Sequence, residues 1–207
     1  MHLDKISPDK HVNDRVVLLF ENGEKVNCFT ENVADFSLHS DMELDDDTYE
    51  SLLAAIAFSR TRRRAAAVVS SRAISRGELK SRLMEKGESE EDSQAAVDRL
   101  SLAGALNDSE YAASIVRHYA GRGYGKGRIK AEFSKRKIPR GLWEDALAGM
   151  PDMSERINDL LRSKLQGKQT DKMLLKKAAD ALYRRGYSWE EINDAIRRFG
   201  DPGAMEE

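Results

Sequence analysis

The feature that most constrains this fold is an internal repeat. One apolar and basic pattern occurs three times, at spacings of 50 and 49 residues, without a gap inside any copy. Repetition at such a period indicates one supersecondary unit stacked several times. Such an array presents a long binding surface rather than a catalytic pocket. The copies align as Leu79, Leu83, Lys86-Gly87, Ala96, Val97 and Leu100; Ile129, Phe133, Arg136-Lys137, Ala146, Leu147 and Met150; and Ala178, Leu182, Arg185-Gly186, Ala195, Ile196 and Phe199.

Each copy is predicted to contain a short helix, a basic turn and a second helix. In the first copy Ser75 is placed to cap the first helix, Gly87 to end it and Ser89 to open the second, as residues of these types commonly do. Further helices begin near Asn107 and at a Ser154 cap, and they connect successive copies. The expected unit therefore has three helices.

The N-terminal part is predicted to contain a β-hairpin over residues 15–29. Two apolar stretches flank Asn22-Gly23, a dipeptide that favours a tight turn with positive φ at both positions. A two-stranded hairpin is marginal alone, and the segment 34–38 is a candidate to pack with it.

A long helix is expected to follow. The acidic stretch 41–47 is interpreted as a solvated loop, and Thr48 as the cap of a helix over residues 49–71. The predicted organisation is an N-terminal extension over 1–47, a connecting helix over 48–74, repeats over 75–106, 107–150 and 151–200, and a tail over 201–207.

Composition narrows the class of protein. Apolar residues make up 40% of the chain and charged residues 34%, too mixed for general disorder. The charged start has no apolar signal region, and no apolar run reaches membrane-spanning length. The single cysteine, Cys28, excludes an internal disulfide and is interpreted as a small strand residue. We therefore expect a cytoplasmic protein.

Charge is distributed unevenly along the chain. Residues 1–56 hold 4 Lys or Arg against 13 Asp or Glu, and the remaining residues hold 30 against 23. This asymmetry favours a polyanionic partner for the basic part. Ordinary solvated helix faces explain the totals equally well.

The sharpest local feature is a glycine-basic segment over residues 117–130. Glycines alternate there with Arg, Tyr and Lys, so backbone N–H groups and cations could gather around an anion at a helix N-terminus. Tyr124 could stack on a base or enter a protein interface. The spacing does not fit a phosphate-binding nucleotide loop, and no strand precedes it. A flexible linker remains the alternative.

Two other basic clusters have simpler alternatives. Residues 135–137, echoed by Lys86 and by residues 184–185, could form one edge of an array or only stabilise helix ends. Arg60 and the three arginines 62–64 cannot all join one face, so some are expected to be exposed, with plain solvation as the alternative.

The search for catalytic residues finds none. The four histidines show no metal-ligand spacing, and Cys28 has no nearby base in the sequence. Trp143 and Trp189 are interpreted as core residues. We expect no enzyme activity, cofactor or metal.

Four segments resemble the RecX family, and the similarity covers nearly the whole chain, most tightly from about residue 65 to 199. The N-terminal hairpin is similar to an extension found in some Gram-positive members. Ala105 and Lys137 depart from the pattern, where an aromatic residue and Gly are more usual. The four segments are 75–87, 106–112 (the family's L-N-D-x-x-[FY]-A element), 123–129 and 185–190.

The resemblance implies an all-helical regulator of the bacterial recombinase RecA. Members bind in the groove of the RecA–DNA filament and suppress its extension, its strand exchange and its coprotease role. We expect a mainly α protein, with tandem three-helix repeats in an elongated curved array and a small N-terminal β-hairpin. The rivals are a helical-repeat DNA-binding protein acting without a recombinase and, more distantly, a protein scaffold. We expect a monomer that contacts the filament, with single- or double-stranded DNA as a further partner, through Arg117, Arg122, Tyr124, Lys126, Arg128, Lys130, Lys135, Arg136 and Lys137.

Overall fold

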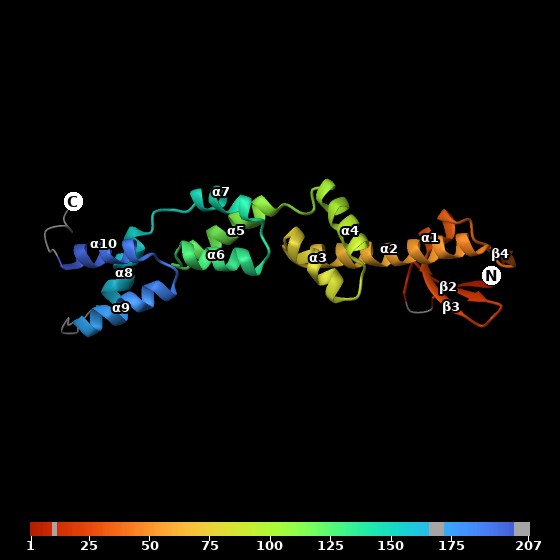
Figure 1. The fold of residues 1–207 in the computed structure, drawn as a ribbon, viewed down its shortest axis with the longest axis horizontal. Coiled ribbons are helices and arrows are strands. Elements are labelled where there is room, and N and C mark those ends of the chain that lie inside the picture. The colour runs from red at the N-terminus through yellow and green to blue at the C-terminus, as the bar shows by residue number, and fades with distance from the viewer. Residues whose placement is uncertain (10–11, 166–171, 201–207) are drawn as a thin grey trace. The chain divides into compact units, whose positions relative to one another are not determined.

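The computed structural model describes residues 1–9, 12–165 and 172–200. The chain divides into two compact units. Unit 1 comprises Met1–Arg72 and Leu79–Ala105, and unit 2 comprises Ala73–Glu78 and Leu106–Glu207. Unit 1 holds the strands, and unit 2 is helical in its described part (Figure 1).

Unit 1 begins with an antiparallel sheet in the strand order β3-β2-β1-β4. The predicted hairpin is confirmed, with Arg15 opposite Phe29. Its turn differs from the prediction, because Gly23 alone has positive φ, at 82°, and donates from its N–H to the carbonyl of Phe20. Segment 34–38 packs with the hairpin as expected, because Leu38 lies in the same buried core and Phe36 packs against it. The strands are β1 (His2–Pro8), β2 (Arg15–Phe20), β3 (Lys25–Phe29) and β4 (Met42–Glu43).

The helix α1 (Thr30–Asp35) follows β3 directly and includes the first residues of the segment expected to pack with the hairpin. It is tied to the long helix α2 (Asp46–Ser71) by a buried hydrogen bond from Asn32 to Ser59, 3.1 Å long. The predicted Thr48 cap is wrong. The carboxylate of Asp45 accepts from the N–H of Thr48, so the helix starts earlier, and Asp46 and Asp47 lie in its first turn. Negative charge is favourable there because it opposes the helix dipole.

The sheet and the start of α2 share one apolar core. Cys28 lies in it, as expected for a small strand residue, and burial raises the pKa of its thiol to about 11. A thiol with such a pKa stays protonated and unreactive at neutral pH. The core residues are Leu3, Leu18, Phe20, Cys28, Leu38, Leu44, Leu52 and Ile56.

The first repeat pairs α3 (Arg76–Glu85) and α4 (Glu90–Leu102) after α2. Its predicted caps are confirmed: Ser75 accepts from the N–H of Glu78, and Ser89 from that of Asp92. Gly87 has φ of 85° at the end of the first helix. Leu79, Leu83, Ala96 and Val97 are buried.

The second repeat consists of α5 (Asp108–Gly121), α6 (Lys126–Lys135), the 3-10 turn η1 (Arg140–Leu142) and α7 (Trp143–Ala148). The helix α5 begins where it was expected, and the side chain of Asn107 caps it. The aligned apolar positions of the repeat form its core, which confirms the reading of the repeat. The buried residues are Ala112, Ile115, Val116, Ile129, Phe133, Ile138 and Leu147.

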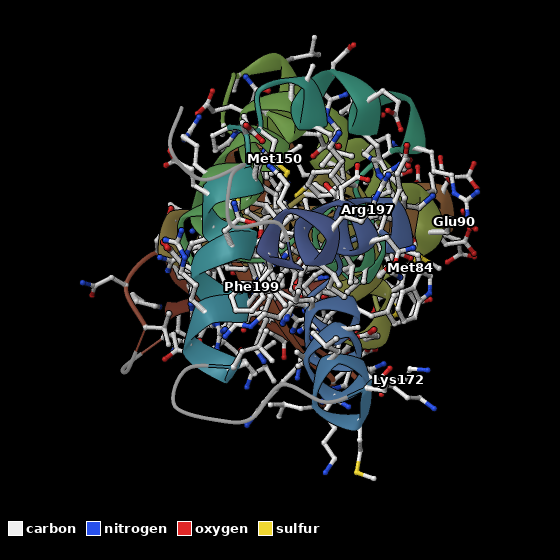
Figure 2. The ribbon with its side chains drawn as sticks, turned by 90° about the vertical axis from the view of Figure 1, so that its left-hand side faces the viewer. Met84, Glu90, Met150, Lys172, Arg197 and Phe199 are labelled. Atoms are coloured by element: carbon white, nitrogen blue, oxygen red, sulfur yellow. The ribbon has the colours of Figure 1, made fainter. Side chains whose placement is uncertain are left out.

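The third repeat consists of α8 (Ser154–Leu165), α9 (Lys172–Arg184) and α10 (Trp189–Gly200). Ser154 is not the cap, because its N–H donates to the carboxylate of Asp152. Phe199 on α10 packs against the apolar core of this repeat, whereas Lys172 at the start of α9 is exposed (Figure 2). Met150 contacts the cores of both repeats two and three. The core is built from Ala120, Met153, Ile157, Leu161, Leu165, Ala178, Ala179, Leu182, Tyr187, Ile192 and Ala195.

The predicted fold class is confirmed as mainly helical, with three-helix domains and a small N-terminal sheet. The elongated, curved arrangement stays a prediction, as does the tail, which lies outside the described residues. In the described part of the chain, no helix combines the length and apolar character that membrane crossing requires. The described residues also contain no cluster of three or more His, Cys, Asp or Glu able to hold a metal ion.

Candidate functional site

The glycine-basic turn between α5 and α6 is held by the third repeat. The N–H of Gly125 donates to the carbonyl of Arg185 at 2.9 Å, and the N–H of Gly127 donates to that of Gly186 at 2.8 Å. The buried hydroxyl of Tyr187 donates to the carbonyl of Gly123 at 3.0 Å. These two N–H groups are therefore not available to an anion, which corrects that part of the expectation. The turn is also not a free linker.

We call the contact between this turn and the turn at residues 185–187 the joint. Glycine is required on both of its sides. A Cβ on Gly125 would lie 2.7 Å from the backbone nitrogen of Tyr187. A Cβ on Gly186 would lie 2.7 Å from the Cβ of Arg128, and Gly186 also has φ of 92°. Only glycine adopts that backbone conformation without strain. The alternation of glycines in the sequence thus reflects close backbone packing.

The same joint recurs one repeat earlier. Ser75 donates to the carbonyl of Arg136, and a Cβ on Gly77 would lie 2.9 Å from the carbonyl oxygen of Lys137. These are the positions that align with Gly125, Gly127, Arg185 and Gly186. Lys137 has φ of 53°, so a lysine adopts the left-handed conformation at the place where repeat three has glycine. The joint is a property of the repeat.

Arg185 and Tyr124 complete the joint between repeats two and three. Arg185 donates to the carbonyls of Arg122 and Gly123 at 3.3 and 3.4 Å, and its guanidinium lies 5.4 Å from the ring centroid of Tyr124. The half-buried ring of Tyr124 also packs against Tyr119, with centroids 5.5 Å apart. Tyr124 is therefore engaged within the protein.

The buried carboxylate of Glu132 on α6 contacts two of the predicted residues. Glu132 is buried and lies 3.3 Å from the guanidinium of Arg128 and 3.5 Å from that of Arg136. Arg136 also donates to the hydroxyl of Tyr111 at 2.5 Å. Burial alone would lower the pKa of Arg136, but its contacts with Tyr111 and Glu132 raise it above its ordinary value. Arg136 thus remains a fixed cation with a structural role.

The other predicted cations are more open. Arg117 pairs with Glu110 at 2.8 Å and Lys130 with Glu144 at 3.1 Å, both at the surface. The exposed side chain of Arg122 contacts His118 at 3.4 Å. Exposed pairs of this kind contribute little to stability and are readily exchanged for another partner.

We call Lys126, Lys135 and Arg184 the open cations of unit 2, because they have no hydrogen-bond or ion-pair partner among the described residues. Lys126 and Arg184 line a groove of about 690 Å³ between α6 and the turn that joins α9 to α10. Arg128 and Ala131 also line it. Lys135 follows these two residues at i+7 and i+4, on the same helix face. The open cations therefore border one surface of unit 2.

The arginines of α2 are not open in this way. We call Arg60, Arg62, Arg63 and Arg64 the α2 arginines; Arg62 pairs with Glu31 and Arg63 with Asp14. Acidic residues of the N-terminal part thus pair with arginines of the basic part, which accounts for some of the charge asymmetry. The alternative interpretation, that these arginines are only solvated, is therefore wrong.

Arg60 and Arg64 pair with one buried carboxylate, that of Glu88, whose side chain is 1% exposed. Thr61 adds a hydrogen bond of 2.8 Å. Burial alone would raise the pKa of Glu88, but the hydrogen bonds from Arg60 and Thr61 and the charge of Arg64 hold it below its ordinary value. The charged form is therefore the stable one in the folded protein.

The two tryptophans differ in burial. Trp143 is half-buried, packs on Phe133 and donates to the carbonyl of Ile138 at 3.0 Å. Trp189 is not a core residue: it is 48% exposed and stacks on Tyr183, which is 54% exposed. The sequence analysis missed this pair. Comparing equivalent positions of the three repeats would have found it, since only the third repeat has aromatic residues there.

Comparisons with known proteins agree on one family. A family model described as the second three-helix domain of RecX matches residues 107–147, and one for its third three-helix domain matches residues 152–196. The chain is 39% identical over 137 residues to a regulatory protein RecX of Xanthomonas axonopodis pv. citri (strain 306), covering 65% of this chain and 84% of that relative. It is 36% identical over 141 residues to the regulatory protein RecX of Stenotrophomonas maltophilia (strain R551-3), covering 65% and 83%.

Solved structures share the fold. A crystal structure of regulatory protein RecX matches with a TM-score of 0.73 at 20% identity, over 95% of this chain and 98% of that chain. The crystal structure of RecX from Lactobacillus salivarius matches with a TM-score of 0.65 at 23% identity, over 70% and 98%. At these identities the likeness concerns the fold alone.

Proposed function

We propose that this chain, which belongs to the RecX family, is a negative regulator of the RecA recombinase. It binds in the groove of the RecA–DNA filament and inhibits the recombinase, ATPase and coprotease activities. It acts as a cytoplasmic monomer and without catalysis of its own. The relatives that it matches are named regulatory proteins. The contact with the RecA–DNA filament is what this proposal adds to that name.

The observation that supports this function most is the contrast between paired and unpaired cations. The α2 arginines have acidic partners in unit 1, whereas the open cations have none in the described part of unit 2. Exposed cations without partners are available to phosphate or to an acidic protein surface. The surface around α6 is therefore the proposed contact with the filament.

The nine residues predicted to bind take different parts in this proposal. Lys126 and Lys135 contact the filament directly, together with Arg117, Arg122, Arg128 and Lys130. Arg136, Tyr124 and the backbone of Lys137 hold the turns that present those side chains, because their contacts lie within the protein.

The test measures the ATPase activity of RecA on single-stranded DNA while this protein is titrated in below stoichiometric ratio. The expected result is inhibition at low ratios, because each bound molecule affects a stretch of filament. A Lys126→Ala, Lys135→Ala variant should require a higher ratio, at least about threefold, because two charge-assisted contacts are lost.

A matched control removes the same charge elsewhere. Lys5 and Lys25 are exposed on β1 and β3, so a Lys5→Ala, Lys25→Ala variant has the same net charge as the test variant. It should inhibit as the unchanged protein does. Equal inhibition by the test variant and the unchanged protein would show that the α6 surface is not the contact.

The second candidate function is DNA binding without any recombinase, which the same open cations favour. Such binding falls steeply with salt, because its driving force is the release of counterions from DNA. A protein that only competes for the strand would inhibit the ATPase only when it saturates the DNA, and the inhibition would vanish at physiological salt.

A further inference from the structure

The third repeat exposes a stacked aromatic pair that its own fold does not use. Tyr183 lies in the last turn of α9 and Trp189 is the first residue of α10. Their ring centroids are 5.1 Å apart and their planes differ by 19°. The rings are 54% and 48% exposed, although large aromatic side chains gain much free energy from burial. Such a pair exposes aromatic surface, and another flat ring can stack on such a surface.

The three-helix unit does not require aromatic residues at these positions. The residues that align with Tyr183 and Trp189 are Met84 and Glu90 in the first repeat and Ser134 and Arg140 in the second. All four are exposed, as the aromatic pair is. The pair is therefore specific to repeat three and is not explained by the packing that the repeats share.

Cations lie in the groove that Tyr183 lines. Lys126 and Arg184 are open there, and the one ion pair of Arg128 with a described residue is that with Glu132. Of the two acidic residues that also line the groove, Glu191 accepts from the N–H of Ser188 at 2.7 Å and caps its own helix. Glu190 is the acidic residue of the groove lining without a partner among the described residues. Free positive charge in the groove thus exceeds free negative charge.

We propose that this groove binds single-stranded nucleic acid. A base stacks on the Tyr183–Trp189 pair, and the phosphates on either side contact Lys126 and Arg184. Exposed aromatic rings beside cations match a ligand that alternates flat rings with anions. A duplex hides its base faces, and a basic peptide would be repelled. The inference rests on the second candidate function, DNA binding without a recombinase, and deepens it by naming the site and the form of the strand.

The test measures fluorescence anisotropy of a labelled thymidine oligonucleotide as the full-length protein is added at moderate salt. An abasic oligonucleotide of equal length keeps the phosphates and removes the bases. The expected result is binding of the thymidine strand at least about fivefold tighter than the abasic one, because stacking of one base contributes this much. A duplex of the same length should bind no better than the abasic strand.

Two variants locate the effect. Tyr183→Met with Trp189→Leu removes the rings but keeps apolar bulk, and it should bind both strands equally while its circular dichroism stays unchanged. Leu102→Ala, at a side chain that is largely exposed in repeat one, is the matched control and should preserve the discrimination. Glu190→Gln should tighten thymidine binding about twofold, because it removes an opposing charge.

Three outcomes would overturn the inference. Equal binding of the two strands by the unchanged protein would mean that cations alone act. Discrimination that survives in the double variant would place the base elsewhere. Binding of neither strand, with loss of RecA inhibition in the double variant, would assign the aromatic pair to a protein contact.

Discussion

The two basic regions of this protein differ in whether their cations have acidic partners. The α2 arginines lie in a helix that packs between α1 and α4, and each is paired with a carboxylate. The open cations lie at the start and the end of α6 and at the end of α9, where no acidic side chain of the described chain pairs with them. A cluster of cations therefore indicates a binding surface only when the tertiary structure leaves it without partners.

The largest effect on the free energy of unfolding is expected for a substitution in the joint next to Lys126. Gly186→Ala should lower the free energy of unfolding by at least about 3 kcal/mol, because backbone strain adds to overlap with Arg128. Urea unfolding would measure it.

Gly87 is the matched control for this change. It aligns with Gly186, has φ of 85° and has no heavy atom within 4 Å of an added Cβ. Gly87→Ala should therefore cost only the strain of the left-handed conformation, about 1 kcal/mol. Equal losses in the two variants would mean that the joint contributes no packing of its own.

The next largest effect on stability is expected where the α2 arginines pair with the buried carboxylate of Glu88. Arg64→Ala should lower the free energy of unfolding by about 2 kcal/mol, because a buried carboxylate loses a charged hydrogen-bond donor. Arg117→Ala, which breaks a surface pair, should cost less than about 1 kcal/mol. Chemical denaturation of both variants measures the two free energies of unfolding. Similar losses of stability would show that the pairs of α2 contribute no more than a pair at the surface.

The stability contributed by the buried carboxylate of Glu88 should depend on pH. The pKa of Glu88 is lowered in the folded protein, so its contribution to stability is complete above the ordinary pKa of about 4.3. The contribution is lost as the pH falls through the lower pKa of the folded state. Unfolding measured between neutral pH and about pH 3 should therefore show a smaller decline for Glu88→Gln than for the unchanged protein. If stability fell with pH in the same way in both proteins, Glu88 would not contribute to the acid sensitivity.

The smallest effect on stability is expected at the open cations. Lys126→Ala with Lys135→Ala should change the free energy of unfolding by less than about 0.5 kcal/mol, because neither side chain has a described partner. The same variant is expected to require a higher ratio to inhibit RecA. A clear drop in its melting temperature would show instead that these lysines have a structural role, and the contrast between the two regions would fail.

The sequence predicted the elements whose causes are local. Ser75, Ser89 and Asn107 cap their helices by hydrogen bonds that reach three residues along the chain, so residue type and spacing suffice. The threefold spacing of apolar residues likewise identified the cores of the repeats. Where a competing acidic cap stood nearby, at Asp45 and Asp152, the same reasoning chose the wrong residue.

The tertiary structure alone decided which candidate residues are free. Glu88 is close to the α2 arginines because α4 packs on α2, and Gly125 meets Gly186 because two turns about 60 residues apart in the sequence pack backbone to backbone. The exposure of Trp189 depends in the same way on what the neighbouring helices leave uncovered. The sequence by itself determined the repeat, its helices and its family resemblance. Partnership and exposure depend on contacts between distant segments, which no local pattern encodes.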